Sequence, residues 1–108
     1  MPTVYIVNKS GHDFTPASDF GELRFMSEGT MHRFAVSEMY RVFAKELKDS
    51  KKEDYLLLTS LTTMSVIAAA CFTYIHGRLN LLMYDTKKRR YVERRLVLGE
   101  LLADVPAG

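Results

Sequence analysis

The chain has 108 residues, of which 47% are hydrophobic and 26% are charged, as is usual for a single globular domain. Its formal net charge of +2 is too small to indicate a polyanionic partner by itself. The one cysteine, Cys71, excludes an internal disulfide, and the N-terminus has neither the basic start nor the long apolar run of a secretory signal. These features favour a cytoplasmic, reducing location.

Strand and helix patterns alternate through the first half of the chain. Residues 3–7 form a β-branched and aromatic run typical of a strand, and Pro16 indicates a short helix beginning at residue 15. Residues 22–29 predict a second strand that ends at a glycine. In residues 30–50, apolar side chains recur every three or four positions, which predicts an amphipathic helix with His32 in its first turn.

Residues 55–75 contain no formally charged side chain, and a stretch of this length could cross a lipid bilayer. However, five hydroxyl groups fall within residues 59–65, at the middle, where a membrane span would be most apolar. We therefore interpret residues 54–60 as a buried strand and residues 62–77 as a helix, and we keep the membrane span as the weaker alternative.

The remaining patterns complete an α/β domain. Residues 79–85 predict a fourth strand, and residues 91–98 predict a C-terminal antiparallel edge strand. Together the elements predict a small Rossmann-like three-layer domain over residues 1–98, with about four parallel strands, followed by a C-terminal tail at 99–108. Two or three helices are few for covering both faces of such a sheet, so we expect a homodimer.

The turn "TSLTT", residues 59–63, is the most informative candidate site. Ligands of open parallel sheets bind outside the carboxyl ends of the strands, and a helix N-terminus offers free N–H groups to a phosphate. We expect Ser60, Thr62 and Thr63 to hold phosphate, with helix capping as the plain alternative. No GxGxxG or Walker A sequence supports a dinucleotide or an ATP-hydrolysing site.

The strand, hydroxyl-rich turn and helix of "LLLTSLTTMSVIAAA" resemble the corresponding part of CARF-type domains, which are Rossmann-like sensors of cyclic oligoadenylates. The resemblance covers 15 of the 108 residues, and the turn lacks the glycines and the lysine usual in that family. It implies a cyclic oligonucleotide as one ligand class, and it does not identify the family of the chain.

The loop "NKSGHD" after the first strand supplies further polar groups. Lys9 and Ser10 could complete a phosphate cradle, and His12 is the candidate acid or base if a reaction occurs. The plain alternative is a flexible polar turn in which Gly11 supplies a positive φ. The three histidines fall on different elements without zinc-ligand spacing, so we predict no metal site and no cofactor.

The basic run between residues 87 and 95 carries six positive charges, at Lys87, Lys88, Arg89, Arg90, Arg94 and Arg95. A nucleic-acid backbone is one partner for such a run. Protection of an outer strand against edge-to-edge pairing is another explanation, and the hairpin could also reach over the phosphates of a ligand.

We therefore expect a small soluble module, outside the membrane, that binds a phosphate-bearing ligand at the carboxyl edge of its sheet. A nucleotide or a short, linear or cyclic, oligonucleotide is the first choice. The alternatives are a non-enzymatic protein-interaction or regulatory factor, and a nucleic-acid binder that uses the basic hairpin. No motif selects a reaction, so the sequence leaves open whether the protein is an enzyme.

Overall fold

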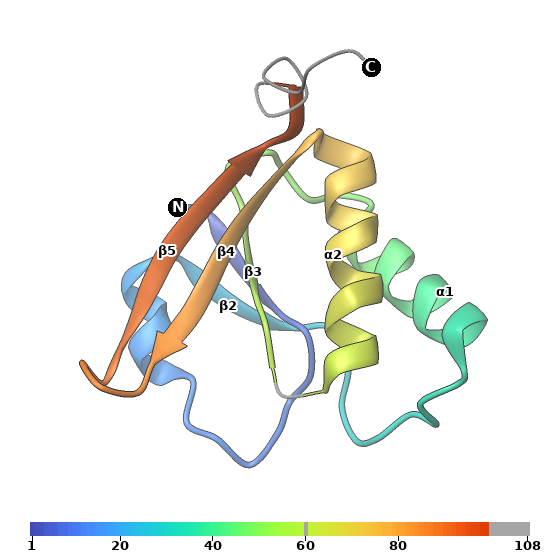
Figure 1. Cartoon of the computed structure of the whole chain (residues 1–108), viewed down its shortest axis with the longest axis horizontal. Helices are drawn as coiled ribbons and strands as arrows, with labels where there is room; N and C mark the ends of the chain where they lie inside the picture. The colour runs from blue at the N-terminus through green and yellow to red at the C-terminus, as the bar shows by residue number, and fades with distance from the viewer. Residues whose placement is uncertain (60, 100–108) are drawn as a thin grey trace, which may run out of the picture.

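The computed structural model describes residues 1–59 and 61–99, which form a mixed α/β domain built on one five-stranded sheet (Figure 1). The sheet order is β2-β1-β3-β4-β5, with parallel pairing from β2 through β4 and an antiparallel pair at β4 and β5. The predicted parallel strands and antiparallel edge strand are thus confirmed. In chain order the elements are β1 (Thr3–Ile6), the 3-10 helix η1 (Thr15–Asp19), β2 (Glu22–Phe25), α1 (Val36–Leu47), β3 (Tyr55–Leu57), α2 (Thr62–His76), β4 (Arg78–Asp85) and β5 (Arg90–Val97).

The uncharged stretch 55–75 folds as strand β3 and helix α2, as the hydroxyl cluster predicted. Helix α2 ends at Gly77, whose φ of 66° lies in the left-handed region that favours glycine. The Gly77 N–H donates to the carbonyl of Thr73 at 2.8 Å. Among residues 1–59 and 61–99, no helix has both the length and the apolar character that a membrane span needs.

The two faces of the sheet are covered unequally. Because successive side chains of a strand point to opposite faces, Tyr5 and Leu56 pack against α1 and α2, whereas Ile6 and Leu57 face η1. Figure 1 shows α1 and α2 side by side on one side of the sheet. The first face therefore carries two long helices, and the second carries one short helix with the buried side chains of Phe14 and Ala17.

Helix α1 begins six residues later than the sequence predicted, at Val36 instead of Thr30. A local turn occupies the intervening residues. The ring Nδ1 of His32 accepts the N–H of Phe34 at 3.2 Å, and the His32 carbonyl accepts the N–H of Ala35 at 2.8 Å. These bonds replace the first helical hydrogen bonds, so His32 precedes the helix and is not part of its first turn.

A buried network of polar side chains connects neighbouring segments at the amino edge of the sheet. The Asp54 carboxylate accepts the backbone N–H of Thr3 at 2.9 Å and that of Lys51 at 2.7 Å. The side-chain amide of Asn80 donates to the carbonyls of Lys52 and Asp54 at 2.7 and 2.9 Å. The Asp54 and Asn80 side chains are buried, and these hydrogen bonds compensate for the cost of burying them.

Candidate functional site

A cleft of about 490 Å³ lies at the carboxyl edge of the sheet, on the η1 face. Figure 1 shows the loop after β1, the start of α2 and the β4–β5 turn at the same end of the molecule. The chain passes from β1 to β2 at one edge and then crosses back to β3, so the strand order reverses between β1 and β3. This is where open α/β sheets bind ligands. The cleft is lined by His12, Asp13, Phe14, Pro16, Leu57, Leu58, Thr59, Tyr84 and Tyr91.

Two tyrosines form an aromatic wall of the cleft. Tyr84 and Tyr91 are cross-strand partners, and their ring centroids lie 5.2 Å apart in an edge-to-face arrangement. Burial raises the pKa of Tyr91, and electrostatic interactions with Tyr84 and Asp13 act in the same direction. The Tyr91 hydroxyl therefore stays protonated at neutral pH. The wall combines flat apolar surface with hydroxyl donors, a combination that suits a planar heterocycle.

Two hydroxyl groups at this edge are buried without a hydrogen-bond partner among the described residues. They are Oγ1 of Thr59, which lines the cleft, and Oγ of Ser10. The main chain of Thr59 is held in place, because its carbonyl accepts the Ser65 hydroxyl at 3.2 Å. A buried polar group that lacks a partner costs about 1–3 kcal/mol, so an incoming acceptor or donor at Thr59 would recover free energy.

The loop after β1 adds a fixed negative charge. Hydrogen bonding by the side chain and the backbone N–H of Thr15 lowers the pKa of Asp13, which keeps its carboxylate ionised. The backbone bond measures 2.9 Å. The predicted residue His12 lines the same cleft, and its ring centroid lies 6.3 Å from that of Phe14. Asp13 repels a phosphate, whereas it can accept hydrogen bonds from the hydroxyls of a sugar.

Two of the predicted phosphate residues, Thr62 and Thr63, are not among the residues that line the cleft. Thr62 is exposed and Thr63 half-buried, and both already belong to α2, while Ser60 falls outside the described residues. The N-cap of α2 is Leu61, whose side chain cannot cap, and the first helical bond joins the Ser65 N–H to the Leu61 carbonyl at 2.9 Å. The explanation that Thr62 and Thr63 serve as N-caps is therefore wrong.

Lys9 points away from the cleft, toward the β2 side of the sheet. Its Nζ lies 3.9 Å from the Glu28 carboxylate and 5.8 Å from the centroid of the Phe25 ring. The adjacent loop contains Gly11, which does not have the positive φ considered for it, since the positive values among the described glycines occur at Gly29 and Gly77. Within the described residues, no group of three or more His, Cys, Asp or Glu side chains could hold a metal ion.

The basic hairpin lies on the outermost strand, β5, and its turn reaches the carboxyl edge. The Asp85 carboxylate orders this turn by accepting the N–H groups of Lys87 and Lys88 at 3.0 and 3.2 Å. Arg94 and Arg95 are consecutive on β5 and so point to opposite faces, and Arg95 lies 3.8 Å from Glu93. The six cations therefore do not form one continuous basic face.

In a comparison with known protein families, the model described as phage Pam3 gp32-like protein matches residues 2–98. The chain belongs to the phage Pam3 gp32-like family. Neither a curated protein nor a solved structure matches this Pam3 gp32-like chain. The matched residues include all five strands, both long helices and every residue that lines the cleft.

Sequence reasoning did not assign Tyr84 and Tyr91 to the cleft of this Pam3 gp32-like chain, and in the turn 59–63 it chose Ser60, Thr62 and Thr63 instead of Thr59. A signal for the tyrosines was present, because Tyr84 and Tyr91 are the first aromatic residues on either side of the hairpin turn. In a two-residue alternation, Thr59 also shares a face with Leu57. What the sequence lacked was the register that pairs Tyr84 with Tyr91.

Proposed function

We propose that this Pam3 gp32-like chain binds a nucleotide, or a short linear or cyclic oligonucleotide, in the cleft between the ends of β1 and β3. The observation that carries the proposal concerns Thr59, a residue that lines the cleft. Its hydroxyl is buried and has no hydrogen-bond partner among the described residues. A ligand atom that hydrogen-bonds this hydroxyl compensates for its burial.

The chemistry of the cleft matches the three parts of a nucleotide. The base stacks on the ring of Tyr84, which is 51% exposed, beside Tyr91. Asp13 accepts hydrogen bonds from the sugar hydroxyls, and His12 accepts or donates hydrogen bonds there. The phosphates extend past Thr59 toward the N-terminus of α2, where the helix dipole and the uncapped N–H groups favour negative charge.

The flanking residues complete the proposed site. Thr62 and Thr63, together with Ser60, add hydroxyl donors at the start of α2, and the reversal of strand order supports a Rossmann-like domain. Ser10 is a further donor from the β1 loop, and Lys9 joins only if its contact with Glu28 is exchanged for the phosphate. His12 is the acid or base if turnover occurs. A cytoplasmic location and a homodimer remain predictions.

The nucleic-acid alternative has less support, because the cations of the hairpin are divided between two faces of β5. The basic turn instead lies close to Tyr84, where it could approach the phosphates of a ligand in the cleft. The protein-interaction alternative rests on a different surface, on helices α1 and α2.

The test is calorimetric titration of the 108-residue chain with mono-, di- and cyclic nucleotides and with short RNA and DNA oligomers at moderate salt. We expect Thr59→Val, which removes the hydroxyl and keeps the shape, to weaken binding at least tenfold while the protein stays folded. Thr73→Val, at the opposite end of α2, is the matched control and should bind as the parent does.

Two further variants separate the parts of the site. Tyr84→Leu should weaken ligands with a base and leave inorganic phosphate unaffected, whereas the triple change of Ser60, Thr62 and Thr63 to Ala should weaken both. No binding by any nucleotide or oligomer, or unchanged affinity in folded Thr59→Val, would contradict the proposal.

A further inference from the structure

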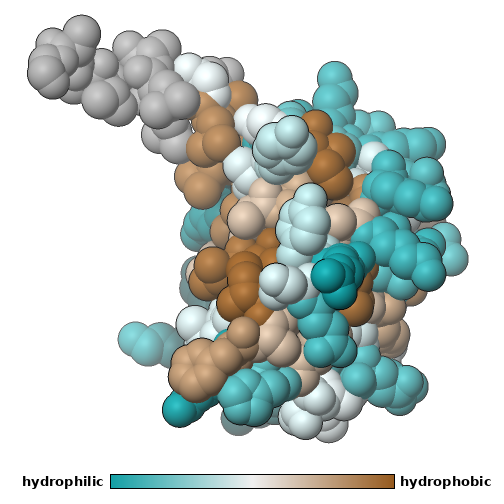
Figure 2. All heavy atoms as spheres, turned by 90° about the vertical axis from the view of Figure 1, so that its right-hand side faces the viewer, coloured by the Kyte–Doolittle hydropathy of each residue, from teal (hydrophilic) through white to brown (hydrophobic). Residues whose placement is uncertain are grey.

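A second hollow, a groove of about 990 Å³, runs between α1 and α2 on the outer surface of the helical layer. Figure 2 shows apolar residues gathered on this side of the molecule. The larger apolar side chains along the groove include Tyr40 from α1 and Tyr74 and Ile75 from α2. Tyr40 is 59% exposed and Tyr74 is 92% exposed, so a substantial aromatic surface faces solvent. Contiguous apolar surface of this kind marks interaction sites.

Helix α2 lacks charge on every side, including the side that faces solvent. From Thr62 to Ile75 it carries no formally charged side chain. Val66, Ala70 and Tyr74, which follow one another at intervals of four residues, are exposed along its outer side. A helix without a charged face is normally buried, so the outer side of α2 has the composition of a surface that a partner covers.

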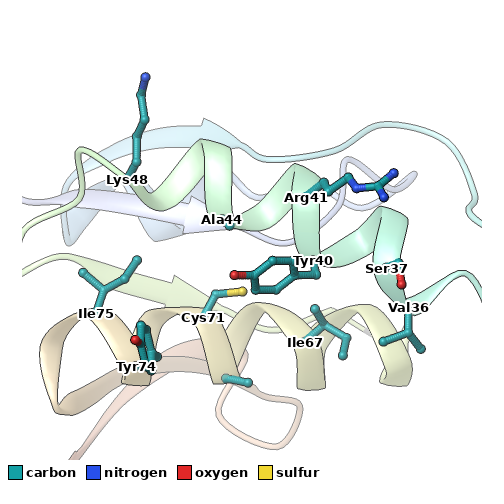
Figure 3. Close-up of a pocket in the computed structure, with 11 residues that line it drawn as sticks. Val36, Ser37, Tyr40, Arg41, Ala44, Lys48, Ile67, Cys71, Tyr74 and Ile75 are labelled. Atoms are coloured by element: carbon teal, nitrogen blue, oxygen red, sulfur yellow. The ribbon is translucent and has the colours of Figure 1, made fainter.

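The shape of the groove suits a helix as the occupant. Figure 3 shows Cys71 between α1 and α2, with its sulfur beside the ring of Tyr40. Ala44, Ala70 and Cys71 are small lining residues, and they leave room for the apolar side chains of a third helix. Helix α1 has 12 residues and is about 18 Å long, so an occupant of about three turns matches it. A lipid surface is flat and would contact only the rim of such a groove.

The charges of the groove limit the composition of that helix. Its charged lining residues are Arg41 and Lys48, and neither forms an ion pair within residues 1–59 and 61–99. None of the described residues that line the groove is acidic. Figure 3 shows Lys48 at the end of the groove near Ile75, with Arg41 farther along the same wall. Both cations belong to α1, so the occupant should carry acidic side chains on the flank that faces α1.

The positions of the two cations also set a spacing. Arg41 and Lys48 are seven residues apart, which is about two helical turns and about 10 Å along the axis of α1. Two acids seven positions apart on an occupant that lies along the groove have the same separation. A second copy of this chain does not meet the requirement groove to groove, because its described lining residues supply the same two cations and no acid.

We propose that the groove binds an amphipathic helix of a partner protein. Apolar side chains at the i, i+3, i+4, i+7 spacing of that helix enter the groove between Tyr40 and Tyr74, and two acids seven positions apart pair with Arg41 and Lys48. The groove lies on the helical face of the sheet, whereas the nucleotide cleft lies on the η1 face. The proposal therefore does not depend on the nucleotide site.

The first test is a selection from a displayed library of helical peptides of about 14 residues, with the 108-residue chain as the target. The apolar spacing is fixed in this library, and all flanking positions are random. We expect the recovered peptides to carry Asp or Glu at two positions seven apart on one flank. Recovery of no binder, or of binders whose flanks are neutral or basic, would overturn the proposal.

A charge exchange locates the recovered peptide on the groove. We expect Arg41→Glu with Lys48→Glu to weaken its binding at least tenfold by fluorescence anisotropy, and we expect lysines in place of the two peptide acids to restore the affinity. Lys45→Glu with Lys52→Glu changes the net charge equally at exposed residues that do not line the groove, and should bind as the parent does. Equal losses in the two folded variants would assign the effect to net charge and contradict the pairing.

A steric change provides the last test. Ala70→Phe fills the groove and should reduce peptide binding at least tenfold, whereas Val66→Phe, one turn earlier on the exposed side of α2, does not line the groove and should not. The same variants are examined by analytical ultracentrifugation and by sedimentation with anionic phospholipid vesicles. A dimer, or vesicle binding, that Ala70→Phe abolishes would assign the groove to a second copy or to lipid and overturn the proposal.

Discussion

Two pairs of polar residues, one at each edge of the sheet, differ in how their buried groups are bonded. At the amino edge, the buried side chains of Asp54 and Asn80 make short hydrogen bonds to backbone groups of the neighbouring segments. At the carboxyl edge, the buried hydroxyls of Ser10 and Thr59 make none with the described residues. The first arrangement stabilises the fold, and the second leaves hydrogen-bonding capacity for a ligand.

The comparison indicates which polar residues of a small α/β domain are structural. Asp54 precedes β3 and Thr59 follows it, so one short strand connects a satisfied group to an unsatisfied one. Substitutions of Asp54 and Asn80 should therefore reduce stability, and substitutions of Ser10 and Thr59 should leave stability unchanged or improve it. The changes below test this difference and are given in order of decreasing effect on stability.

Asn80→Ala should produce the largest effect. It leaves the carbonyls of Lys52 and Asp54 without their donor in a buried site, and we expect the free energy of unfolding to decrease by about 2–4 kcal/mol. Urea denaturation followed by circular dichroism measures this change. Thr86→Ala, an exposed change in the hairpin turn, is the control, and a loss below about 1 kcal/mol at Asn80 would show that the network is dispensable.

A pair of glycines tests the same difference through the backbone. A Cβ at Gly21, beside the amino edge, would lie 2.1 Å from the carbonyl oxygen of Pro2, whereas a Cβ at Gly11, at the carboxyl edge, meets nothing within 4 Å. We expect Gly21→Ala to cost about 2–3 kcal/mol and Gly11→Ala to change stability by less than about 0.5 kcal/mol. Differential scanning calorimetry should give different melting temperatures for the two variants. Equal melting temperatures would show that the backbone at Gly21 is no more constrained than the backbone at Gly11.

Removing the unpartnered hydroxyls should increase the free energy of unfolding, whereas the changes at the amino edge decrease it. Thr59→Val and Ser10→Ala each eliminate a buried group without a partner, so we expect the unligated protein to gain up to about 1 kcal/mol. Chemical denaturation without nucleotide gives the value. If the free energy of unfolding decreased by more than about 1 kcal/mol, these hydroxyls would be hydrogen-bonded in the unligated protein and would stabilise the fold.

The smallest expected effect is a pH dependence at the amino edge. Burial lowers the pKa of His76 from its usual 6.5, an effect that Asp54 and Glu53 partly oppose and Arg78 reinforces. The unfolded chain therefore binds a proton more readily than the folded chain, and stability should decrease as pH falls below about 6.5. His76→Gln should flatten this part of the stability profile, and an unchanged slope would assign it to other groups.

Much of the fold follows from local patterns in the sequence. The uncharged run, its hydroxyl cluster and Gly77 predicted β3 and α2, and the mostly parallel sheet follows from the alternation of elements. The start of α1 could not be predicted in this way, because the His32 turn competes with the helix through hydrogen bonds that periodicity does not represent.

The candidate site was only partly predictable. His12 was found because it follows a strand in a polar loop, and it does line the cleft. Tyr84 and Tyr91 become neighbours only through the β4–β5 register, and the absence of a partner for Thr59 is a property of the packed interior. The groove between α1 and α2 likewise depends on how two helices pack, which composition alone does not determine.

The pairing of β1 with β3 also affects how the protein is made. Residue pairs such as Val4 and Tyr55 are adjacent in the sheet but about fifty positions apart in the chain, so β1 leaves the ribosome long before its partner. The uncharged stretch 55–75 then emerges before β4, which flanks β3 on its other side. Until β3 pairs with β1, this stretch exposes an uncharged run as long as a membrane span to the solvent and to chaperones.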